Sequence, residues 1–212
     1  MVTSRSRHLH AVLLAIVLAA LIWSGIRPAD RAVWFMEVVP AIAGVIILAA
    51  TYARHRLTDL VYVLVAGHCL ILIVGGHYTY AEVPIGNWVR DTFHLARNHY
   101  DRLGHLAQGF VPAIIAREIL LRSSPLRRGA WLFVLVTCFC LALSAFYELV
   151  EWWVAVSGQQ SAEAFLGTQG DVWDTQWDMF CCLCGAIVAQ LMLAGWHDRQ
   201  LRQADLLPPD KA

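Results

Sequence analysis

Residues 32–52 read AVWFMEVVPAIAGVIILAATY, and Glu37 is the only charged side chain among these 21 positions. A helix of that length spans about 30 Å, which is the thickness of the hydrocarbon core of a bilayer. Three further runs, 9–26, 58–76 and 129–156, are similarly poor in charge. Of the 212 residues, 58% are hydrophobic and 15% are charged, which is more apolar surface than a soluble domain of this size can bury. The sequence therefore predicts an integral membrane protein.

Two more segments, 101–121 and 173–196, have the length of a membrane-spanning helix but carry several polar side chains. With the four apolar runs they predict an all-α fold, a polytopic helical bundle of about six transmembrane helices. We expect residues 1–198 to form one transmembrane helical domain and residues 199–212 a mobile cytoplasmic tail. Arg5 and Arg7 precede the first apolar run as in a signal peptide. We expect an uncleaved helix there, because no clear small-residue cleavage site follows.

The distribution of arginine predicts how the chain crosses the membrane, because basic residues in short loops favour the cytoplasmic side. With the N-terminus in the cytoplasm, ten basic residues lie inside and five outside. The ten are Arg5, Arg7, Arg54, Arg56, Arg122, Arg127, Arg128, Arg199, Arg202 and Lys211, and the five are Arg27, Arg31, Arg90, Arg97 and Arg102. We therefore expect a bacterial inner-membrane protein with both termini in the cytoplasm and the long loops 77–100 and 157–172 outside. Aromatic rings favour the interface, where this topology places Trp88, Trp152, Trp153, Trp173 and Trp177.

Charge and cysteine content argue against other classes of partner and site. The formal net charge is zero and the arginines stand in small separate groups, so we expect lipid and no nucleic acid as a partner. The six cysteines fall within apolar runs, where cysteine behaves as a small hydrophobic residue, so we expect no disulfide framework. Cys181, Cys182 and Cys184 do not predict a metal site, because helical neighbours one and two positions apart point in different directions.

Ionisable side chains inside a bilayer are costly unless they are paired, so their depth in the predicted helices is informative. Four helices carry such groups within roughly the outer third of the bilayer. They are Glu37 on the second helix, Asp101 and His105 on the fourth, Glu148 and Glu151 on the fifth, and Asp174 and Asp178 on the sixth. Residues three, four or seven apart share a helix face, so Asp101, His105 and Gln108 form one stripe. The two acids of the fifth helix, and the two of the sixth, can likewise project together.

These positions predict an outward-facing polar site composed of Asp101, His105, Gln108, Glu148, Glu151, Asp174 and Asp178. Imidazole nitrogen and carboxylate oxygen suit zinc, iron or manganese. The side chains expected to bind such a divalent metal are His105, Glu148, Glu151 and Asp178. No other cofactor is indicated. Gly104, Gly109 and Gly185 are small residues that would let the fourth and sixth helices approach closely.

Three functions are compatible with this polar cluster, and the sequence leaves open whether the protein is an enzyme. A bound metal could activate water against a lipid-linked or head-group substrate at the outer leaflet. Carboxylates and histidine could instead relay protons or ions in a small transporter. The same groups could also serve only to hydrogen-bond the helices together. Substrate and oligomeric state are open as well.

Polar residues outside the cluster have structural interpretations. Asp171 is expected to cap the sixth helix, since it precedes the first turn. His68 stands alone in an apolar helix and is expected to be an ordinary core histidine. Arg117 and Glu118 lie near the cytoplasmic end of the fourth helix, where we expect them to anchor its depth.

Three segments resemble the YjdF-like family of bacterial inner-membrane proteins: NHYDRLGHLAQGFVPAIIARE (98–118), SAFYELVEWW (144–153) and GTQGDVWDTQWDMF (167–180). The resemblance covers most of the chain, from the second predicted helix to the sixth. It implies a multi-helix inner-membrane protein and no particular reaction. Over a shorter stretch the chain is also similar to VanZ-like envelope proteins, with His105, Glu148, Asp178 and Gly185 at the matching places. That similarity implies an envelope or lipid-linked substrate.

Overall fold

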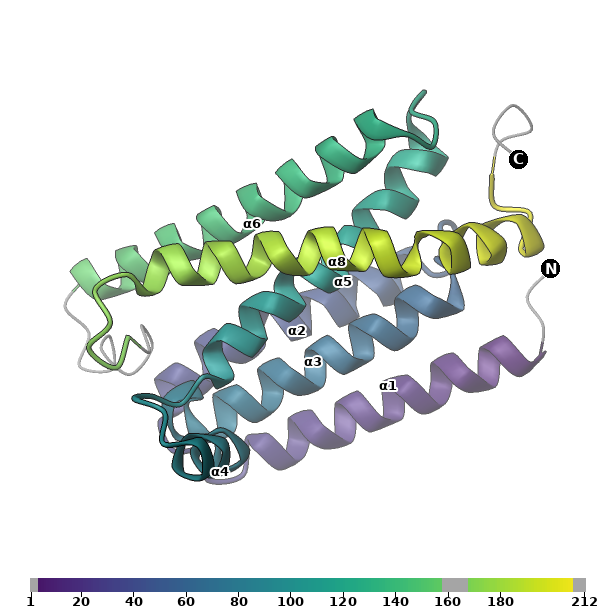
Figure 1. The fold of residues 1–212 in the computed structure, drawn as a ribbon. Coiled ribbons are helices and arrows are strands. Elements are labelled where there is room, and N and C mark those ends of the chain that lie inside the picture. Colours follow the sequence, from purple (N-terminus) through teal and green to yellow (C-terminus); the bar gives the residue numbers. More distant parts are fainter. Residues whose placement is uncertain (1–3, 158–167, 208–212) are drawn as a thin grey trace.

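The computed structural model describes residues 4–157 and 168–207, and over these residues the protein consists of helices joined by loops. Six long helices form the bundle: α1 (Ser4–Ser24), α2 (Arg31–Thr51), α3 (Asp59–Tyr78), α5 (Tyr100–Ser123), α6 (Ala130–Val156) and α8 (Asp174–Gln203). The start of α1 and the end of α8 lie at one end of the bundle, which we call the terminal end, and the short helix α4 lies at the opposite end, the α4 end (Figure 1). The predicted all-α bundle is confirmed.

Five of the six long helices have the length and apolar composition of a membrane span: α1, α2, α3, α6 and α8. The sixth, α5, is more polar because charged side chains stand near both of its ends, among them Asp101, Arg117 and Glu118. Its 24 residues still reach about 36 Å, enough to cross the hydrocarbon core. Twelve of them are buried, because α5 packs against α3, α6 and α8. The buried charges of α5 therefore face other helices rather than lipid.

α5 and α8 make the most extensive contact in the bundle, and they approach each other at two glycines. A Cβ atom on Gly109 would overlap the carbonyl oxygen of Cys182, and one on Gly185 would overlap that of Leu106. Small residues permit such close backbone packing in membranes, so the predicted role of both glycines is confirmed. Gly104 has a different neighbour, since the ring of Tyr80 lies against it.

α1 and α2 lie at the edge of the bundle, and each packs on α3. α2 begins at Asp30, whose side chain accepts hydrogen bonds from the backbone N–H groups of Ala32 and Val33 (2.7 and 2.9 Å). This cap satisfies two of the free donors at the start of the helix. The indole of Trp34 donates to Ser24 Oγ (3.0 Å), which joins the start of α2 to the end of α1.

The segment 77–100, which the sequence predicts as one long loop, contains the single turn η1 (Tyr80–Glu82) and the helix α4 (Pro84–Phe93). Pro84 stands at the start of α4. Proline is favourable there, because the first N–H groups of a helix have no hydrogen-bond partner within it. Figure 1 shows α4 nearly end-on, across the direction of the long helices. Its exposed Ile85, Trp88 and Phe93 are typical of a helix lying in the membrane interface. Its apolar residues recur at helical spacing, so periodicity could have revealed this short amphipathic helix, which a search for membrane-spanning lengths passes over.

The last helix, α8, continues to Gln203 and so passes residue 198, where the sequence predicts the helical domain to end. Leu60 N–H donates to Gln200 Oε1 (3.0 Å) and Leu201 is buried, so the final turns of α8 belong to the bundle. Residues 208–212 of the expected tail, and 158–167 of the second expected loop, lie outside the described residues. All six cysteines are free, as the sequence predicts.

Candidate functional site

Six acidic side chains are buried at the α4 end of the bundle, on four different helices. They are Glu37 on α2, Asp101 on α5, Glu148 and Glu151 on α6, and Asp174 and Asp178 on α8. Each is at most 9% exposed. Because the helices pack side by side, residues predicted to lie at one depth are brought into one layer of the protein.

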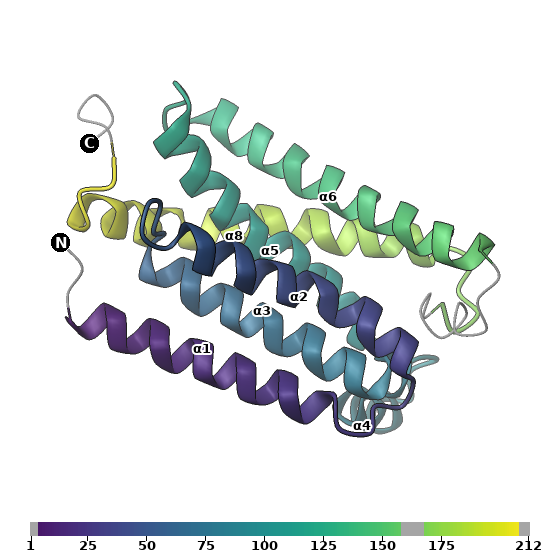
Figure 2. The same ribbon diagram turned by 180° about the vertical axis from the view of Figure 1, so that it is seen from behind.

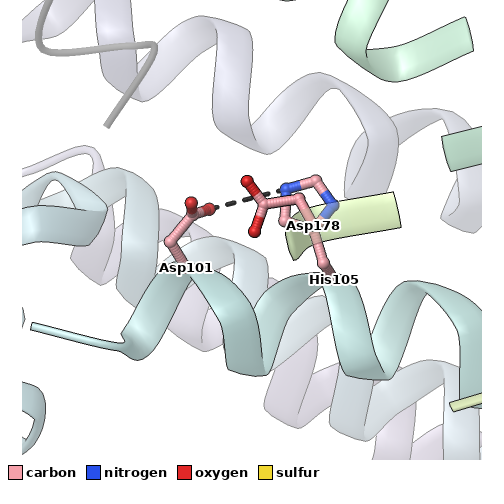
Figure 3. Close-up of side chains that lie close together, drawn as sticks. All are labelled: Asp101, His105 and Asp178. Carbon is pink, nitrogen blue, oxygen red and sulfur yellow. Dashed lines mark ion pairs between the residues drawn. The ribbon is translucent and has the colours of Figure 1, made fainter. Parts of the chain in front are cut away.

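Three of the predicted residues converge at the centre of this layer: Asp101 and His105 from α5, and Asp178 from α8 (Figure 3). One potential ligand atom of each lies within 4.8 Å of the other two. His105 Nε2 is 3.6 Å from Asp101 Oδ1, and His105 Nδ1 is 3.8 Å from Glu148 Oε1 on α6. We call Asp101, His105, Glu148 and Asp178 the His105 cluster.

Hydrogen bonding in the His105 cluster is incomplete. Within the described residues, three of its buried atoms have no hydrogen-bond partner: His105 Nδ1, Glu148 Oε1 and Asp178 Oδ1. Gln108 Oε1, on α5 like His105, is also buried without a hydrogen-bond partner among these residues. His105 is 5% exposed and Asp178 2% exposed, so bulk water does not surround them. Buried polar atoms in folded proteins nearly always have a partner, which means that this cluster has atoms available to a ligand.

A cavity of about 140 Å³ lies beside the cluster, between α2, α3, α5 and α6. Its polar lining consists of Glu37, His68, Tyr80, Asp101, His105, Gln108, Tyr147 and Glu151. Glu151, which the sequence groups with the metal ligands, is therefore a cavity residue and does not belong to the three converging ligand atoms. His68 also lines this cavity. The sequence interpretation of His68 as an ordinary core histidine does not foresee this place beside the site.

Asp174 has an arginine partner, whereas within residues 4–157 and 168–207 no arginine or lysine pairs with Asp178. Asp174 forms an ion pair with Arg97, in the loop before α5. The same guanidinium lies 3.6 Å from Asp171 and 3.9 Å from Asp101. The structure therefore places Asp174 in an arginine network at the edge of the layer, next to the His105 cluster rather than within it.

The sequence predicts that Asp171 caps α8, but in the structure Asp171 stabilises the turn before the helix. Its Oδ1 accepts a hydrogen bond from Trp173 N–H (2.9 Å), and the N-cap residue is Trp173 itself. Arg102 Nη2 donates to Asp171 Oδ2 (2.6 Å). The amide of Trp173, together with the charges of Arg102 and Arg97, holds the pKa of Asp171 below its usual value of 3.8.

Asn98 fixes the loops that cover the site. Its side chain is fully buried and donates to Val83 O (3.1 Å) and to Asn87 Oδ1 (2.9 Å). Its backbone N–H donates to Gln169 Oε1 (3.0 Å), and Gln169 Nε2 donates back to Asn98 O (2.9 Å). These contacts tie α4, the start of α5 and the approach to α8 into one unit above the His105 cluster.

The predicted site lacks several side chains that the structure brings to it: Glu37, which the sequence places at the same depth, and His68, Tyr80, Arg97, Asn98 and Tyr147. For Glu37 a signal exists, because it is the single charge in residues 32–52 and its predicted depth matches the layer. The aromatic residues offer no such signal, since tyrosine is also common at membrane interfaces. Arg97 and Asn98 stand in a loop, where no periodicity indicates which way a side chain points.

The converging atoms can reach the spacing of a divalent metal site by a modest side-chain adjustment. Zinc binds imidazole nitrogen and carboxylate oxygen at about 2.0–2.2 Å in tetrahedral geometry, so two of its ligand atoms lie about 3.4 Å apart. Atoms that already lie within 4.8 Å of one another need to close by at most about 1.4 Å to reach that spacing. Asp101, His105 and Asp178 are therefore the residues that could hold the ion. Glu148 is placed to accept from the other ring nitrogen of His105, as carboxylates commonly do behind metal-bound histidine.

Comparison with known proteins identifies the family. A family model described as "Predicted membrane protein (DUF2238)" matches residues 9–199. The chain is 52% identical over 187 residues to "Inner membrane protein YjdF" of Escherichia coli (strain K12), a match that covers 88% of this chain and 90% of that relative. No solved structure matches the chain. The similarity to VanZ-like proteins stays a prediction. The chain belongs to the DUF2238 family of membrane proteins, the YjdF-like family that its three motifs resemble.

Proposed function

We propose that the protein binds one divalent transition-metal ion through Asp101, His105 and Asp178, and that this site acts on the polar head of a lipid-linked envelope substrate. One observation carries the proposal: three potential ligand atoms lie within 4.8 Å of one another, in a cluster whose buried atoms lack hydrogen-bond partners among the described residues. One nitrogen and two carboxylate oxygens form a donor set that zinc, manganese and iron accept.

Charge balance supports a cation at this place. Six acidic side chains are buried at the α4 end, and the buried Arg97 beside them is shared between Asp174, Asp171 and Asp101. Uncompensated buried charges are strongly unfavourable, whether they are single or of like sign. A divalent ion next to Asp101 and Asp178 would compensate two of these charges at once.

The chemistry that a metal supplies in such a site is Lewis-acid activation of water or of a substrate oxygen. Glu148, 3.8 Å from His105 Nδ1, would hold the imidazole in the ligating orientation. The adjoining cavity has polar groups on α5 and apolar walls from Pro40, Leu72 and Leu143. At about 140 Å³ it is smaller than the roughly 300–1,000 Å³ of typical ligand pockets, so a head group would enter it and a whole lipid would not.

We further propose that this site faces the non-cytoplasmic side. The excess of basic residues at the terminal end supports that orientation, because such residues favour the cytoplasm. Fusions of green fluorescent protein and of alkaline phosphatase to either terminus test it. Fluorescence without phosphatase activity is expected at both ends, and the reverse pattern would move the site to the cytoplasmic leaflet.

Metal analysis of the purified protein tests the metal itself. After dialysis against micromolar Zn²⁺ or Mn²⁺, the wild-type protein is expected to hold about one ion per chain. Asp178→Asn removes one ligand, so metal retention should fall by at least about tenfold. Asp91→Asn is the matched control, since Asp91 is an exposed acid of α4 that pairs with Arg90. Equal and negligible metal in all three proteins would remove the proposal.

A proton- or ion-coupled transporter is the second candidate, and the position of His68 favours it. His68 lies within α3 and lines the same cavity as His105, so ionisable groups continue from the α4 end into the bundle. A transporter predicts flux into proteoliposomes that follows a proton or ion gradient and is lost in His68→Ala. A metal-dependent hydrolase predicts product release without any gradient. A structural protein predicts neither activity, and only loss of folded protein when the cluster is altered.

A further inference from the structure

We infer that a groove between α1 and α2, near the terminal end, binds one acyl chain of an anionic phospholipid, and that basic side chains at its mouth hold the phosphate. The groove lies at the opposite end of the bundle from the His105 cluster. The inference is therefore independent of the function proposed above.

The groove exists because α1 and α2 are consecutive in the chain but do not pack closely on each other. Each packs on α3, and Figure 2 shows α3 running between them. The hydrogen bond from Trp34 to Ser24 joins the two helices near the α4 end. Toward the terminal end they leave a groove of about 460 Å³, within the usual range of ligand pockets. Its walls are apolar and come from all three helices, among them Leu14 and Val17 of α1, Val45 and Ala49 of α2, and Val65 and Ala66 of α3.

The floor of the groove at the terminal end is polar and fully paired. His10 Nδ1 lies 2.8 Å from the hydroxyl of Tyr52, and His10 Nε2 lies 3.0 Å from Asp59 Oδ1. Ser6 Oγ donates to Asp59 Oδ2 (2.8 Å), and the ring of Tyr62 lies 4.0 Å from that of His10. Asp59 is therefore oriented by His10 and Ser6, and among the described residues no ion pair joins it to Arg7 or Arg56.

The mouth of the groove is basic. Arg7 lines it, on the same face of α1 as Ala11 and Leu14. Further basic side chains stand on the loop between α2 and α3, next to Tyr52 of the groove: Arg54, His55 and Arg56. Arg56 lies within electrostatic range of His10, and its Nε and Nη1 atoms are buried without a hydrogen-bond partner among the described residues. Basic pockets between membrane helices favour anionic head groups, so an acidic phospholipid complements both the apolar groove and its mouth.

Native mass spectrometry of the full chain in detergent, titrated with phosphatidylglycerol or with phosphatidylethanolamine of the same acyl chains, tests the inference. The wild-type protein is expected to retain phosphatidylglycerol in preference. Arg7→Gln should weaken that binding roughly fivefold, the effect of one basic residue at an anionic surface. Arg5→Gln is the matched control, because Arg5 is exposed on the same turn but does not line the groove.

A second pair of variants tests the groove itself. Ala49→Phe fills it and should abolish saturable phosphatidylglycerol binding, whereas Ala50→Phe should not, because Ala50 is equally exposed but lies outside the groove. Both alanines are exposed, so neither change overfills the core, and a thermal melt of each variant checks folding. Equal retention of the two lipids, equal effects of the two arginine variants, or wild-type binding by Ala49→Phe would each overturn the inference.

Discussion

α5 and α8 bring a histidine and a carboxylate together twice, once at each end of the bundle, and the two clusters differ in how completely they are paired. At the α4 end, His105 of α5 meets Asp178 of α8, and several buried atoms lack hydrogen-bond partners among the described residues. At the terminal end, His197 of α8 meets Glu118 of α5, with 3.0 Å between Nε2 and Oε2. Both clusters are almost completely buried. Burial of charge by itself therefore does not distinguish a functional site from a structural one.

The terminal cluster is saturated with hydrogen bonds. Glu118 accepts from the backbone N–H of Thr58 (3.1 and 3.2 Å), from the Thr58 hydroxyl (2.8 Å) and from Arg122 (2.8 Å). Arg117 Nη1 lies 2.9 Å from His197 Nδ1. Since arginine has only donors, Nδ1 must accept, and the His197 proton stands on Nε2, facing Glu118. The sequence interpretation of Glu118 as a depth anchor is wrong, because it is fully buried in this network.

The comparison teaches that spare hydrogen-bonding capacity marks a ligand site more specifically than the presence of charged groups. A saturated network can only stabilise the fold, since every atom already has a partner. An incomplete one carries an energetic cost that a ligand can relieve. The following predictions set the two clusters against each other, in order of decreasing effect.

Removing the carboxylate of the saturated cluster should have the largest effect. Glu118→Ala leaves His197, Arg122 and Thr58 with buried unpaired groups, and breaking such a network costs about 3–5 kcal/mol. Thermal unfolding in detergent, followed by size-exclusion chromatography, measures the loss. Glu82→Ala is the control, because Glu82 is exposed and its carboxylate accepts from Asn87, with no other hydrogen-bond partner among the described residues. Its change should stay within about 0.5 kcal/mol. Similar melting of the two variants would show that the saturated cluster contributes no special stability.

Adding a divalent metal should stabilise the wild-type protein through the incomplete cluster. At a metal concentration of about 100 times Kd, binding to the folded state alone adds about 2.7 kcal/mol. The melting temperature with and without Zn²⁺ or Mn²⁺ gives the measurement. Asp178→Asn should lose this increase, and Asp91→Asn should keep it. An equal increase in both variants would place the bound metal elsewhere.

In metal-free protein, Asp178→Asn should cost no stability and could add up to about 1 kcal/mol. The substitution replaces one of several crowded buried carboxyl groups by an amide of the same size, and replacing an unfavourable buried acid is often neutral or stabilising. Glu118→Gln is the matched carboxylate-to-amide change in the saturated cluster, and there it should be clearly destabilising. Chemical denaturation of both variants measures the difference. If Asp178→Asn lowered the free energy of unfolding as Glu118→Gln does, the proposed difference between the two clusters would be wrong.

The smallest effect concerns Asp171, at the rim of the incomplete cluster. Its pKa is lowered in the folded protein by the Trp173 amide and the neighbouring arginines. A lowered folded-state pKa contributes stability above the unfolded pKa, and this stability is lost as pH falls through the folded value. The melting temperature of wild type should therefore exceed that of Asp171→Asn at neutral pH, and the gap should close as pH falls below about 4. A gap that is constant with pH would exclude an electrostatic origin.

Much of the fold could be predicted because hydrophobic length reports on membrane spans. The runs at 32–52 and 58–76 correspond closely to α2 and α3. α4 was beyond that signal, since its ten residues are too few to span and none of them is buried. α5 was predictable as a helix, but only the structure shows that its charged side chains avoid lipid, because α3, α6 and α8 pack around them.

The sequence by itself determined the approximate extents of the six long helices and the position of each polar group along them, because a rise of 1.5 Å per residue converts residue number into distance along the helix axis. Only the tertiary structure decided which groups meet, since partners such as His105 and Asp178, or Glu118 and His197, stand more than seventy positions apart. Their contact depends on how each helix is rotated about its axis and on the glycine crossing of α5 with α8. Spacing along one helix carries no information about that rotation relative to another. For this reason the sequence could place His105, Asp178 and Glu118 on long helices, and only the packed bundle could show the two histidine–carboxylate pairs, of which one is saturated with hydrogen bonds and the other is not.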